Sequence, residues 1–293
     1  MAENYEILLY YKYTDLPDAA ELTAAHKALC QELGLKGRVI IATEGINGTV
    51  EGTIENTAKY QAALTADPRL ADINFKRSPG TGEAFPKLSV KLRDEIVSLH
   101  LGEADFSPTQ VTGKYISAEE LHNWIHSDKE FYIVDMRNDY EHAVGHFAGS
   151  ILPPLTNFRD LPEALPKLAH LKDKTVVTVC TGGVRCEKAS GYLVNNGFND
   201  VYQLQDGIVT YMEKYPNEDF NGQLYVFDGR VTMGFNLDDP KRVIVGKCAK
   251  CDKPCEDYYN CANLNCHKHI IVCSDCLSPG GLAFCSAECE NTH

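Results

Sequence analysis

The sequence predicts an α+β domain, then an α/β domain with a parallel sheet, and finally a cysteine-rich tail. Three observations support this organisation. Strand and helix patterns in residues 1–107 follow the order β-α-β-β-α-β. Residues 113–216 alternate between buried strands and helices, which is typical of a parallel sheet. Nine of the twelve cysteines lie in the last 46 residues, inside the third part, 217–293.

The elements of the first domain follow from apolar periodicity and turn residues. After Pro17, apolar residues recur at helical spacing up to Gly34. A tight turn is expected over residues 44–48, because Asn47-Gly48 is a strong hairpin signal. The other expected elements are strands at 5–11, 38–42, 49–52, 73–76 and 88–99 and a helix at 55–64. This order is that of a split βαβ, ferredoxin-like domain.

Positive charge gathers in the second half of this domain. If residues 88–93 form a strand, Ser89, Lys91 and Arg93 share one of its faces. An ordinary solvated face and a face that contacts phosphates fit this pattern equally well. The candidate RNA-binding residues are Lys76, Arg77, Lys87, Lys91 and Arg93.

The second domain is predicted to begin after a linker over residues 104–114. A capping box formed by Ser117 and Glu120 starts a helix that runs through Trp124. Further elements are expected as strands at 131–134, 175–179 and 201–204 and as a helix at 208–215. Such sheets bind ligands at the carboxyl ends of their strands, where Asp135 and Cys180 lie. We interpret His146, which follows a glycine, as a structural hydrogen-bonding residue.

The segment around Cys180 carries the strongest chemical signal. The β-branched run 175–179 predicts a buried strand, which is followed by a glycine turn and a helix. Backbone N–H groups and the helix dipole converge at such a turn and lower the pKa of a cysteine there. A buried structural cysteine would not need two glycines and an arginine beside it. The sequence therefore predicts catalytic residues Cys180 and Arg185 on an active loop completed by Thr181, Gly182, Gly183 and Val184.

The cysteines of the tail are spaced as metal ligands. Pairs separated by two to four residues present two thiolates to one tetrahedral Zn²⁺. One four-thiolate site is predicted from Cys248, Cys251, Cys273 and Cys276. A second, interleaved site is predicted from Cys261, Cys266, Cys285 and Cys289. Spare or substitute ligands are Cys255, His267, His269 and His293. The zinc would be structural, because four thiolates leave no open position for a substrate.

The composition limits the classes of protein to which the chain can belong. A hydrophobic content of 44% and a charged content of 24% in 293 residues fit an ordinary soluble globular protein. No run is long enough to span a membrane, and the first residues lack a signal-peptide pattern, so a cytoplasmic protein is expected. The net charge of −13 weighs against indiscriminate nucleic-acid binding. Any RNA partner would have to be bound by a local basic patch.

Two motifs in residues 113–216 resemble those of a rhodanese domain. The active loop of that family is a six-residue turn that opens a helix, matched here by Cys180 to Arg185. The upstream motif is matched by Asp135, Arg137, Glu141, Gly145, His146 and Gly149. One departure is Asp206-Gly207, where many members have paired glycines. Cysteine phosphatases of related fold have a loop one residue longer, so the short loop disfavours a phosphatase or an arsenate reductase.

The whole chain is similar to the bacterial tRNA uridine(34) hydroxylases, also called rhodanese-domain UPF0176 proteins. The resemblance rests on residues 42–48 (Ala-Thr-Glu-Gly-Ile-Asn-Gly), on residues 180–186 (Cys-Thr-Gly-Gly-Val-Arg-Cys) and on the cysteine-rich tail. It implies oxygen-dependent hydroxylation of carbon 5 of the wobble uridine of tRNA, with Cys180 as the essential residue. Molecular oxygen would be a co-substrate, and the sequence shows neither a flavin nor a haem motif.

Two other functions stay open at this point. A rhodanese-type sulfurtransferase would carry a persulfide on Cys180 and need a sulfur donor or a thiol reductant. A non-catalytic adaptor would bind RNA or protein through its zinc tail. The sequence specifies neither the tRNAs recognised, nor the way oxygen is activated, nor the oligomeric state.

Overall fold

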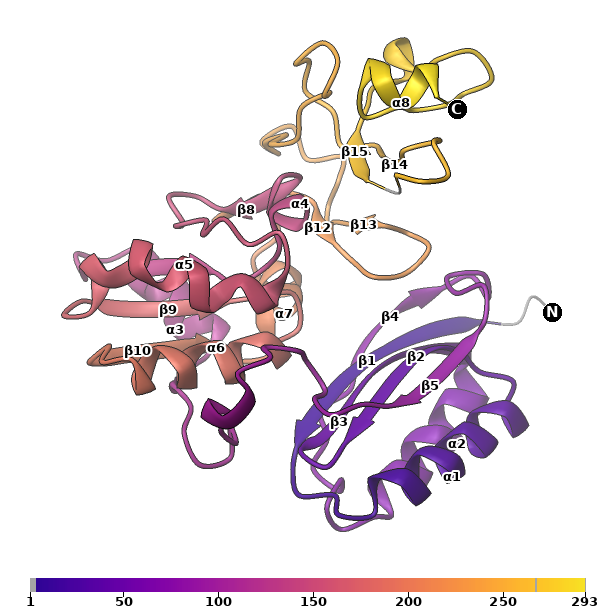
Figure 1. Cartoon of the computed structure of the whole chain (residues 1–293), viewed down its shortest axis with the longest axis vertical. Helices are drawn as coiled ribbons and strands as arrows, with labels where there is room; N and C mark the ends of the chain where they lie inside the picture. The colour runs from indigo at the N-terminus through magenta and orange to yellow at the C-terminus, as the bar shows by residue number, and fades with distance from the viewer. Residues whose placement is uncertain (1–3, 267, 293) are drawn as a thin grey trace.

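The fold is described from a computed structural model, which describes residues 4–266 and 268–292 (Figure 1). It consists of the two predicted domains and a tail, and the predicted fold class is confirmed. The cysteine-rich tail lies above both domains in this view, at the opposite end from helices α1 and α2.

The first domain is a five-stranded sheet with two helices on one face. Its strands and helices in chain order are β1 (Tyr5–Tyr13), α1 (Ala19–Glu32), β2 (Lys36–Ala42), β3 (Gly45–Thr53), α2 (Ile54–Thr65), β4 (Lys76–Gly80) and β5 (Leu88–Leu92). The strand order is β4-β1-β3-β2-β5, in which the ferredoxin-like core is extended by β5 parallel to β2. The strands expected at 73–76 and 88–99 are therefore displaced or shorter.

The predicted turn over residues 44–48 is wrong. Strand β3 already begins at Gly45, so the turn is limited to Thr43 and Glu44. Asn47 and Gly48 lie inside the central strand, where Gly48 pairs with Tyr10 of β1. A side chain at Gly48 would meet the Tyr10 hydroxyl at 2.3 Å. The glycine is needed here for close packing of a tyrosine and not for a turn.

The two faces of this sheet have different roles. Leu8, Tyr10 and Val39 point toward α1 and α2 and form the core of the domain. The alternate residues, such as Leu9 and Tyr11, point to the other face, which no helix of the first domain covers. That face is turned toward the second domain (Figure 1). It forms one wall of the site described below.

The second domain is a three-layer α/β/α unit. Its strands and helices are β6 (Lys114–Ile116), α3 (Ala118–Ile125), β7 (Tyr132–Asp135), α4 (Asp139–His142), β8 (Gly145–Phe147), α5 (Leu161–Leu168), β9 (Thr175–Val179), α6 (Val184–Asn195), β10 (Asp200–Leu204) and α7 (Gly207–Lys214). The parallel sheet has the order β6-β10-β9-β7. Helices α5 and α6 pack on one face, and α3 and α7 pack on the other. The predicted capping box at Ser117 and Glu120 is confirmed.

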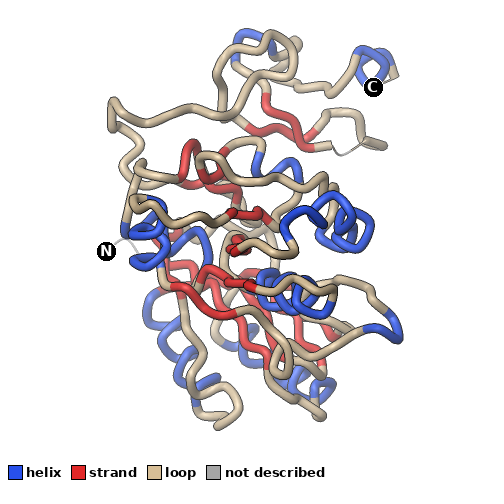
Figure 2. The backbone as a smooth tube through the Cα atoms, turned by 90° about the vertical axis from the view of Figure 1, so that its left-hand side faces the viewer, coloured by secondary structure: helices blue, strands red, loops and turns tan. Residues whose placement is uncertain are grey.

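The tail contains little regular structure. Strand β11 (Phe220–Gly222) pairs with β8 and so attaches the chain to the second domain. The remaining elements are the hairpin β12 (Leu224–Tyr225) with β13 (Thr232–Met233), the pair β14 (Tyr258–Asn260) with β15 (His269–Ile271), and α8 (Ala287–Asn291). Figure 2 shows that most of the tail is loop.

No helix among the described residues combines the length and the apolar character needed to cross a membrane.

Candidate active site

The reactive loop is positioned by the junction between β9 and α6. Cys180 follows the last residue of β9, and Gly183 precedes the first residue of α6 with φ +102°. A side chain at Gly183 would lie 2.8 Å from the Tyr11 hydroxyl of the first domain. The Gly183 N–H donates to the Cys180 Sγ at 3.2 Å. The glycine thus serves both the backbone conformation and the approach of the other domain.

Two opposing effects set the ionisation of Cys180. The side chain is fully buried, and burial disfavours the thiolate. The hydrogen bond from Cys186, the positive charge of Arg185 and the N–H groups of Cys186 and Gly183 favour it. Together they lower the pKa of Cys180 to about 6. Burial and the neighbouring Cys180 raise the pKa of Cys186. Cys180 is therefore the thiolate of the pair at neutral pH, and the thiolate is the nucleophilic form.

Arg185 is held in place by a buried carboxylate. Its two terminal nitrogens lie 2.5 and 2.8 Å from the two oxygens of Glu141. Glu141 also accepts the Asn138 backbone N–H at 3.0 Å, and both Arg185 and Glu141 are buried. The ring of Phe227, from the tail, lies 5.8 Å from the guanidinium. This arrangement fixes a positive charge beside the Cys180 thiolate.

The other polar residues of the upstream motif have structural roles. Asp135 and Arg137 are completely buried and bind each other, with 2.6 Å between Nη2 and Oδ2. Arg137 also donates to the Gly145 carbonyl at 2.7 Å. The Nδ1 of His146 lies 2.9 Å from the His142 carbonyl oxygen, which agrees with the structural interpretation.

Asp206 accounts for the one departure from the rhodanese pattern. It has φ +64°, a conformation that glycine adopts easily and that aspartate tolerates. Its carboxylate accepts Asn74 Nδ2 at 2.7 Å and lies 3.1 Å from Lys76 Nζ. The departure thus provides a contact with the first domain.

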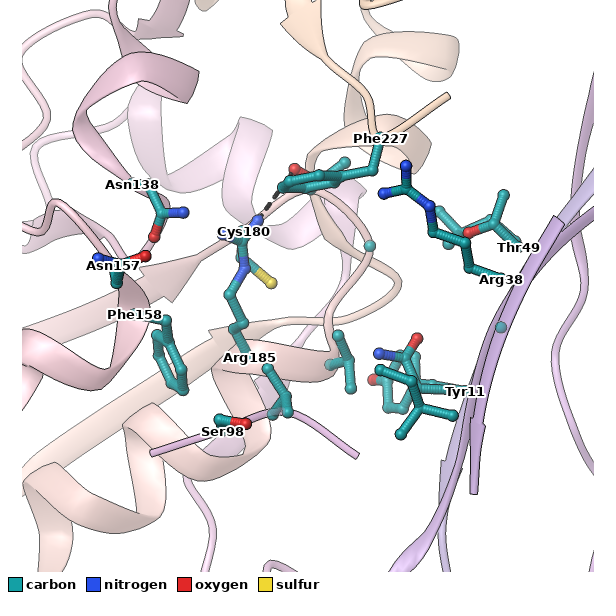
Figure 3. A pocket seen from close by; sticks show the side chains of 18 of the residues that line it. Tyr11, Arg38, Thr49, Ser98, Asn138, Asn157, Phe158, Cys180, Arg185 and Phe227 are labelled. Atoms are coloured by element: carbon teal, nitrogen blue, oxygen red, sulfur yellow. Dashed lines mark hydrogen bonds between the residues drawn. The ribbon is translucent and has the colours of Figure 1, made fainter. Parts of the chain in front are cut away.

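Cys180 lines a cavity of about 350 Å³ between the two domains. Figure 3 shows Tyr11, Arg38 and Thr49 on the first domain, across the cavity from Arg185 and Phe158 of the second. Residues Val97 and Ser98, from the segment that joins the domains, complete the lining together with Phe227. Sequence reasoning predicted Cys180 as the nucleophile, but it missed the wall formed by the open sheet face.

Helix α6 holds the first domain against the loop. The Lys188 Nζ is fully buried and lies 2.9 Å from Glu44 and 2.6 Å from Glu95. Tyr11 donates to Glu187 at 3.1 Å, and Tyr13 donates to the Val184 carbonyl at 3.2 Å.

The structure does not bring the five candidate RNA-binding residues together. Lys76 and Arg77 lie on β4 and Lys91 on β5, which are opposite edges of the sheet. Lys76 is largely buried against Asp206, and Arg77 lies 2.5 Å from Glu6. The remaining three, Lys87, Lys91 and Arg93, stay on the β5 edge and are exposed.

Two unpaired arginines near the cavity were missed. Arg38 on β2 and Arg159 on the opposite wall both line it, and both are exposed. On the neighbouring strand, Lys91 pairs in register with Ile40, which also lines the cavity. Within residues 4–266 and 268–292, none of these three basic side chains forms an ion pair. Only the folded arrangement of distant segments reveals this set.

Comparisons with known proteins agree with this architecture. Family models match a UPF0176 acylphosphatase-like domain at residues 5–96, a rhodanese-like domain at 117–214 and a rhodanase C-terminal domain at 221–290. A protein of Staphylococcus saprophyticus is 45% identical over 98% of this chain and 90% of its own length. One of Bacillus licheniformis is 44% identical over 99% of this chain and 89% of its own. Both are named tRNA uridine(34) hydroxylase.

This chain belongs to the tRNA uridine(34) hydroxylase family. A solved rhodanese-like domain protein of Staphylococcus aureus is 33% identical and covers 33% of this chain and 90% of its own. Its TM-score is 0.30, so it adds nothing to the fold described above.

In this family member, the tail cysteines assemble into two groups of four. The sulfurs of Cys248, Cys251, Cys273 and Cys276 all lie within 4.8 Å of one another, and so do those of Cys261, Cys266, Cys285 and Cys289. This grouping is the one predicted from the spacing. Four thiolates in such proximity fit a tetrahedral Zn²⁺.

The spare ligands named from the sequence lie elsewhere or are not described. Cys255 lies close to Asp257, with 3.9 Å between its Sγ and the Oδ2, and His269 Nδ1 lies 3.3 Å from the Tyr225 hydroxyl. Neither belongs to a cysteine group. His267 and His293 lie outside the described residues.

The low pKa of Cys180 predicts the pH dependence of its alkylation. The reactive thiolate dominates above the pKa, so the rate with iodoacetamide should fall below about pH 6 and be nearly constant above pH 7. Replacing Cys186 by alanine removes a hydrogen bond to the thiolate and should move the midpoint upward. The measurement is peptide mass spectrometry of Cys180 after timed labelling. Cys30→Ala, a buried cysteine in α1, is the control. A midpoint near the ordinary thiol value of about 8.5 in the parent chain would contradict the assignment.

Proposed function

We propose that this chain hydroxylates carbon 5 of uridine 34, the wobble base of tRNA, with Cys180 as the essential residue. The observation that carries the proposal is a cysteine thiolate in a cavity between two domains, in a chain about 45% identical to proteins named for this activity. The proposal includes a cytoplasmic location, which a reaction on tRNA would require.

The cavity suits a nucleobase taken out of its stack. Enzymes that modify a base either act on single strands or extrude the base into a pocket. The cavity has apolar walls from Leu9, Phe158 and Phe227 and polar side chains such as Asn138 and Asn157. Apolar surfaces can contact the faces of a pyrimidine ring, and amides can bind its edge.

The overall reaction needs a reductant. Replacement of the C5 hydrogen by a hydroxyl uses one atom of molecular oxygen. The second oxygen atom leaves as water, which takes two electrons and two protons. We propose that a thiol reductant provides these two electrons and two protons and is itself oxidised to a disulfide. We propose that Cys180 is the nucleophile and that the uracil ring in the cavity lies within its reach.

The first prediction of this proposal concerns the two loop cysteines. Cys180→Ser should lower hydroxylation of tRNA at least about 10³-fold, because a hydroxyl is a far weaker nucleophile than a thiolate. Cys186→Ser keeps a hydrogen-bond donor next to Cys180 and should retain most of the activity. Mass spectrometry of wobble nucleosides from a deletion strain expressing each variant measures this. An equal loss in both variants would indicate instead that the two sulfurs exchange.

A sulfurtransferase activity is the second candidate. The six-residue loop with N–H donors around Cys180 suits a persulfide, and the rhodanese-like model matches residues 117–214. Transfer of sulfur from thiosulfate to cyanide, without any change in tRNA nucleosides on deletion of the gene, would favour this candidate over hydroxylation.

We also propose that tRNA phosphates bind along the β5–β2 edge that leads to the cavity. The support is the unpaired charge of Arg38, Lys91 and Arg159, with Lys87 and Arg93 exposed on the same edge. Phosphate contacts position RNA without reading its sequence. Lys76 and Arg77 are excluded from this surface, because acidic partners already bind them.

The double variant Arg38→Ala/Lys91→Ala should therefore bind tRNA more weakly. Its salt dependence should be flatter by about one unit of slope for each phosphate that the variant no longer binds. Filter binding at several salt concentrations gives both quantities. Arg77→Ala, on the opposite edge of the sheet, is the matched control and should change neither. Unaltered affinity in the double variant would remove this surface from the proposal.

We further propose that each cysteine group holds one structural Zn²⁺. The support is the donor set, because four thiolates from a loop-rich segment leave no position for a substrate. The chelated ions would stabilise a tail that has little regular structure. Because metal binding and folding are coupled, removal of the zinc should unfold the tail before the two domains.

Elemental analysis of single variants tests the zinc proposal. Cys251→Ser should lose one zinc equivalent relative to the parent chain, and Cys285→Ser should lose the other. Cys255→Ser is the control, since Cys255 lies outside both groups and its loss should leave the zinc content unchanged. Stoichiometric iron in place of zinc, or an equal loss in the Cys255 variant, would contradict the assignment.

A further inference from the structure

We propose a third metal site, at the junction of the second domain and the tail, that takes a divalent transition-metal ion through nitrogen and oxygen ligands. Its ligands are His122 of α3, His126 at the C-cap of that helix, and Glu218 and Asp219, which lie just before β11. One ligand atom of each lies within 4.8 Å of the others. The site does not depend on the proposed function.

The geometry of the four side chains favours a common ion. His122 and His126 are one helical turn apart and point to the same side, with ring centroids 4.4 Å apart. Their nitrogens lie 3.0 and 3.1 Å from the two oxygens of Asp219. The Nε2 of His122 lies 3.7 Å from Glu218. Two imidazoles and two carboxylates are a donor set for Zn²⁺, Mn²⁺, Fe²⁺, Co²⁺ or Ni²⁺.

Surrounding residues orient the ligands. The Tyr211 hydroxyl donates to Asp219, which is almost fully buried. The ring of Tyr215 stacks on His122 at 3.9 Å with 5° between the planes. Outer contacts of this kind fix ligand geometry in metal sites.

A hydrogen-bond network alone does not explain the whole cluster. Tyr211 and His122 bind the Oδ2 of Asp219, and His126 lies 3.1 Å from its Oδ1. Glu218, however, lies 3.7 Å from His122 Nε2, which is beyond hydrogen-bond distance. His126 and Glu218 are about half exposed, so burial does not drive them to the same place. Their convergence follows if an ion joins the four side chains.

The position of the site indicates a structural role. It connects α3, the first helix of the second domain, to the first residues of the tail. None of the four ligands belongs to the described lining of the cavity that contains Cys180. We therefore assign the ion to the junction between domain and tail and not to the oxygen reaction.

Cobalt titration of the full chain, loaded beforehand with only the two zinc equivalents that fill the cysteine groups, tests the proposal. The parent should bind one Co²⁺ with visible absorption but without the near-ultraviolet charge-transfer bands of a thiolate complex. His126→Ala should weaken this binding at least about tenfold, and Glu218→Gln should also weaken it. His170→Ala, an exposed histidine outside the cluster, is the control and should bind like the parent.

A second readout is the melting temperature. Cobalt should raise it in the parent and in the His170 variant but not in the His126 variant, because an ion that binds only the folded state stabilises it. Equal cobalt binding in all variants, or absorption from thiolate complexes alone, would overturn the proposal.

Discussion

The alignment of the two domains depends on one buried ammonium group. Lys188 is fully buried in α6, and its Nζ is bound by Glu44 from the turn before β3 and by Glu95 from the segment after β5. A buried charge is tolerated only when its partners are close and well placed. A small displacement of either domain would leave the ammonium short of a carboxylate. This ion pair therefore specifies geometry more than it adds net stability.

Lys188 lies on the first turns of α6, next to the active loop, so the same turns also position the loop. Four consecutive residues each have a separate partner. Arg185 binds Glu141, Cys186 contacts Cys180, Glu187 accepts Tyr11, and Lys188 binds Glu44 and Glu95. The same helix turn thus fixes the thiolate, its counter-charge and the opposing sheet. The cavity exists because these interactions hold the first and second domains at a fixed separation.

The prediction from sequence succeeded where the evidence is local. The strand 175–179, its loop and the following helix were predicted because periodicity, two glycines and an arginine lie within a dozen residues. Asn47-Gly48 was misassigned as a turn because its glycine is required by the close packing of Tyr10, a residue on another strand. The wall formed by Tyr11 and Arg38 was missed for the same reason, because only the folded chain brings it opposite Cys180. The cysteine grouping expected from the spacing matches the proximity of the sulfurs, whereas Glu218 and Asp219 lie more than ninety residues after His122 and were not associated with it.

The net charge of −13 is compatible with an RNA substrate because electrostatics acts locally. At physiological salt, exposed charges are screened beyond roughly 8 Å, so a phosphate responds to its immediate neighbours and not to the total. Ion pairing with acidic side chains then determines which basic residues are free to attract a phosphate. Arg77 is neutralised by Glu6, and Lys76 by Asp206. Arg38, Lys91 and Arg159 keep their charge at the cavity and along the sheet edge beside it, where the described residues offer them no acidic partner. An acidic protein can thus attract an RNA backbone to one place and repel it elsewhere.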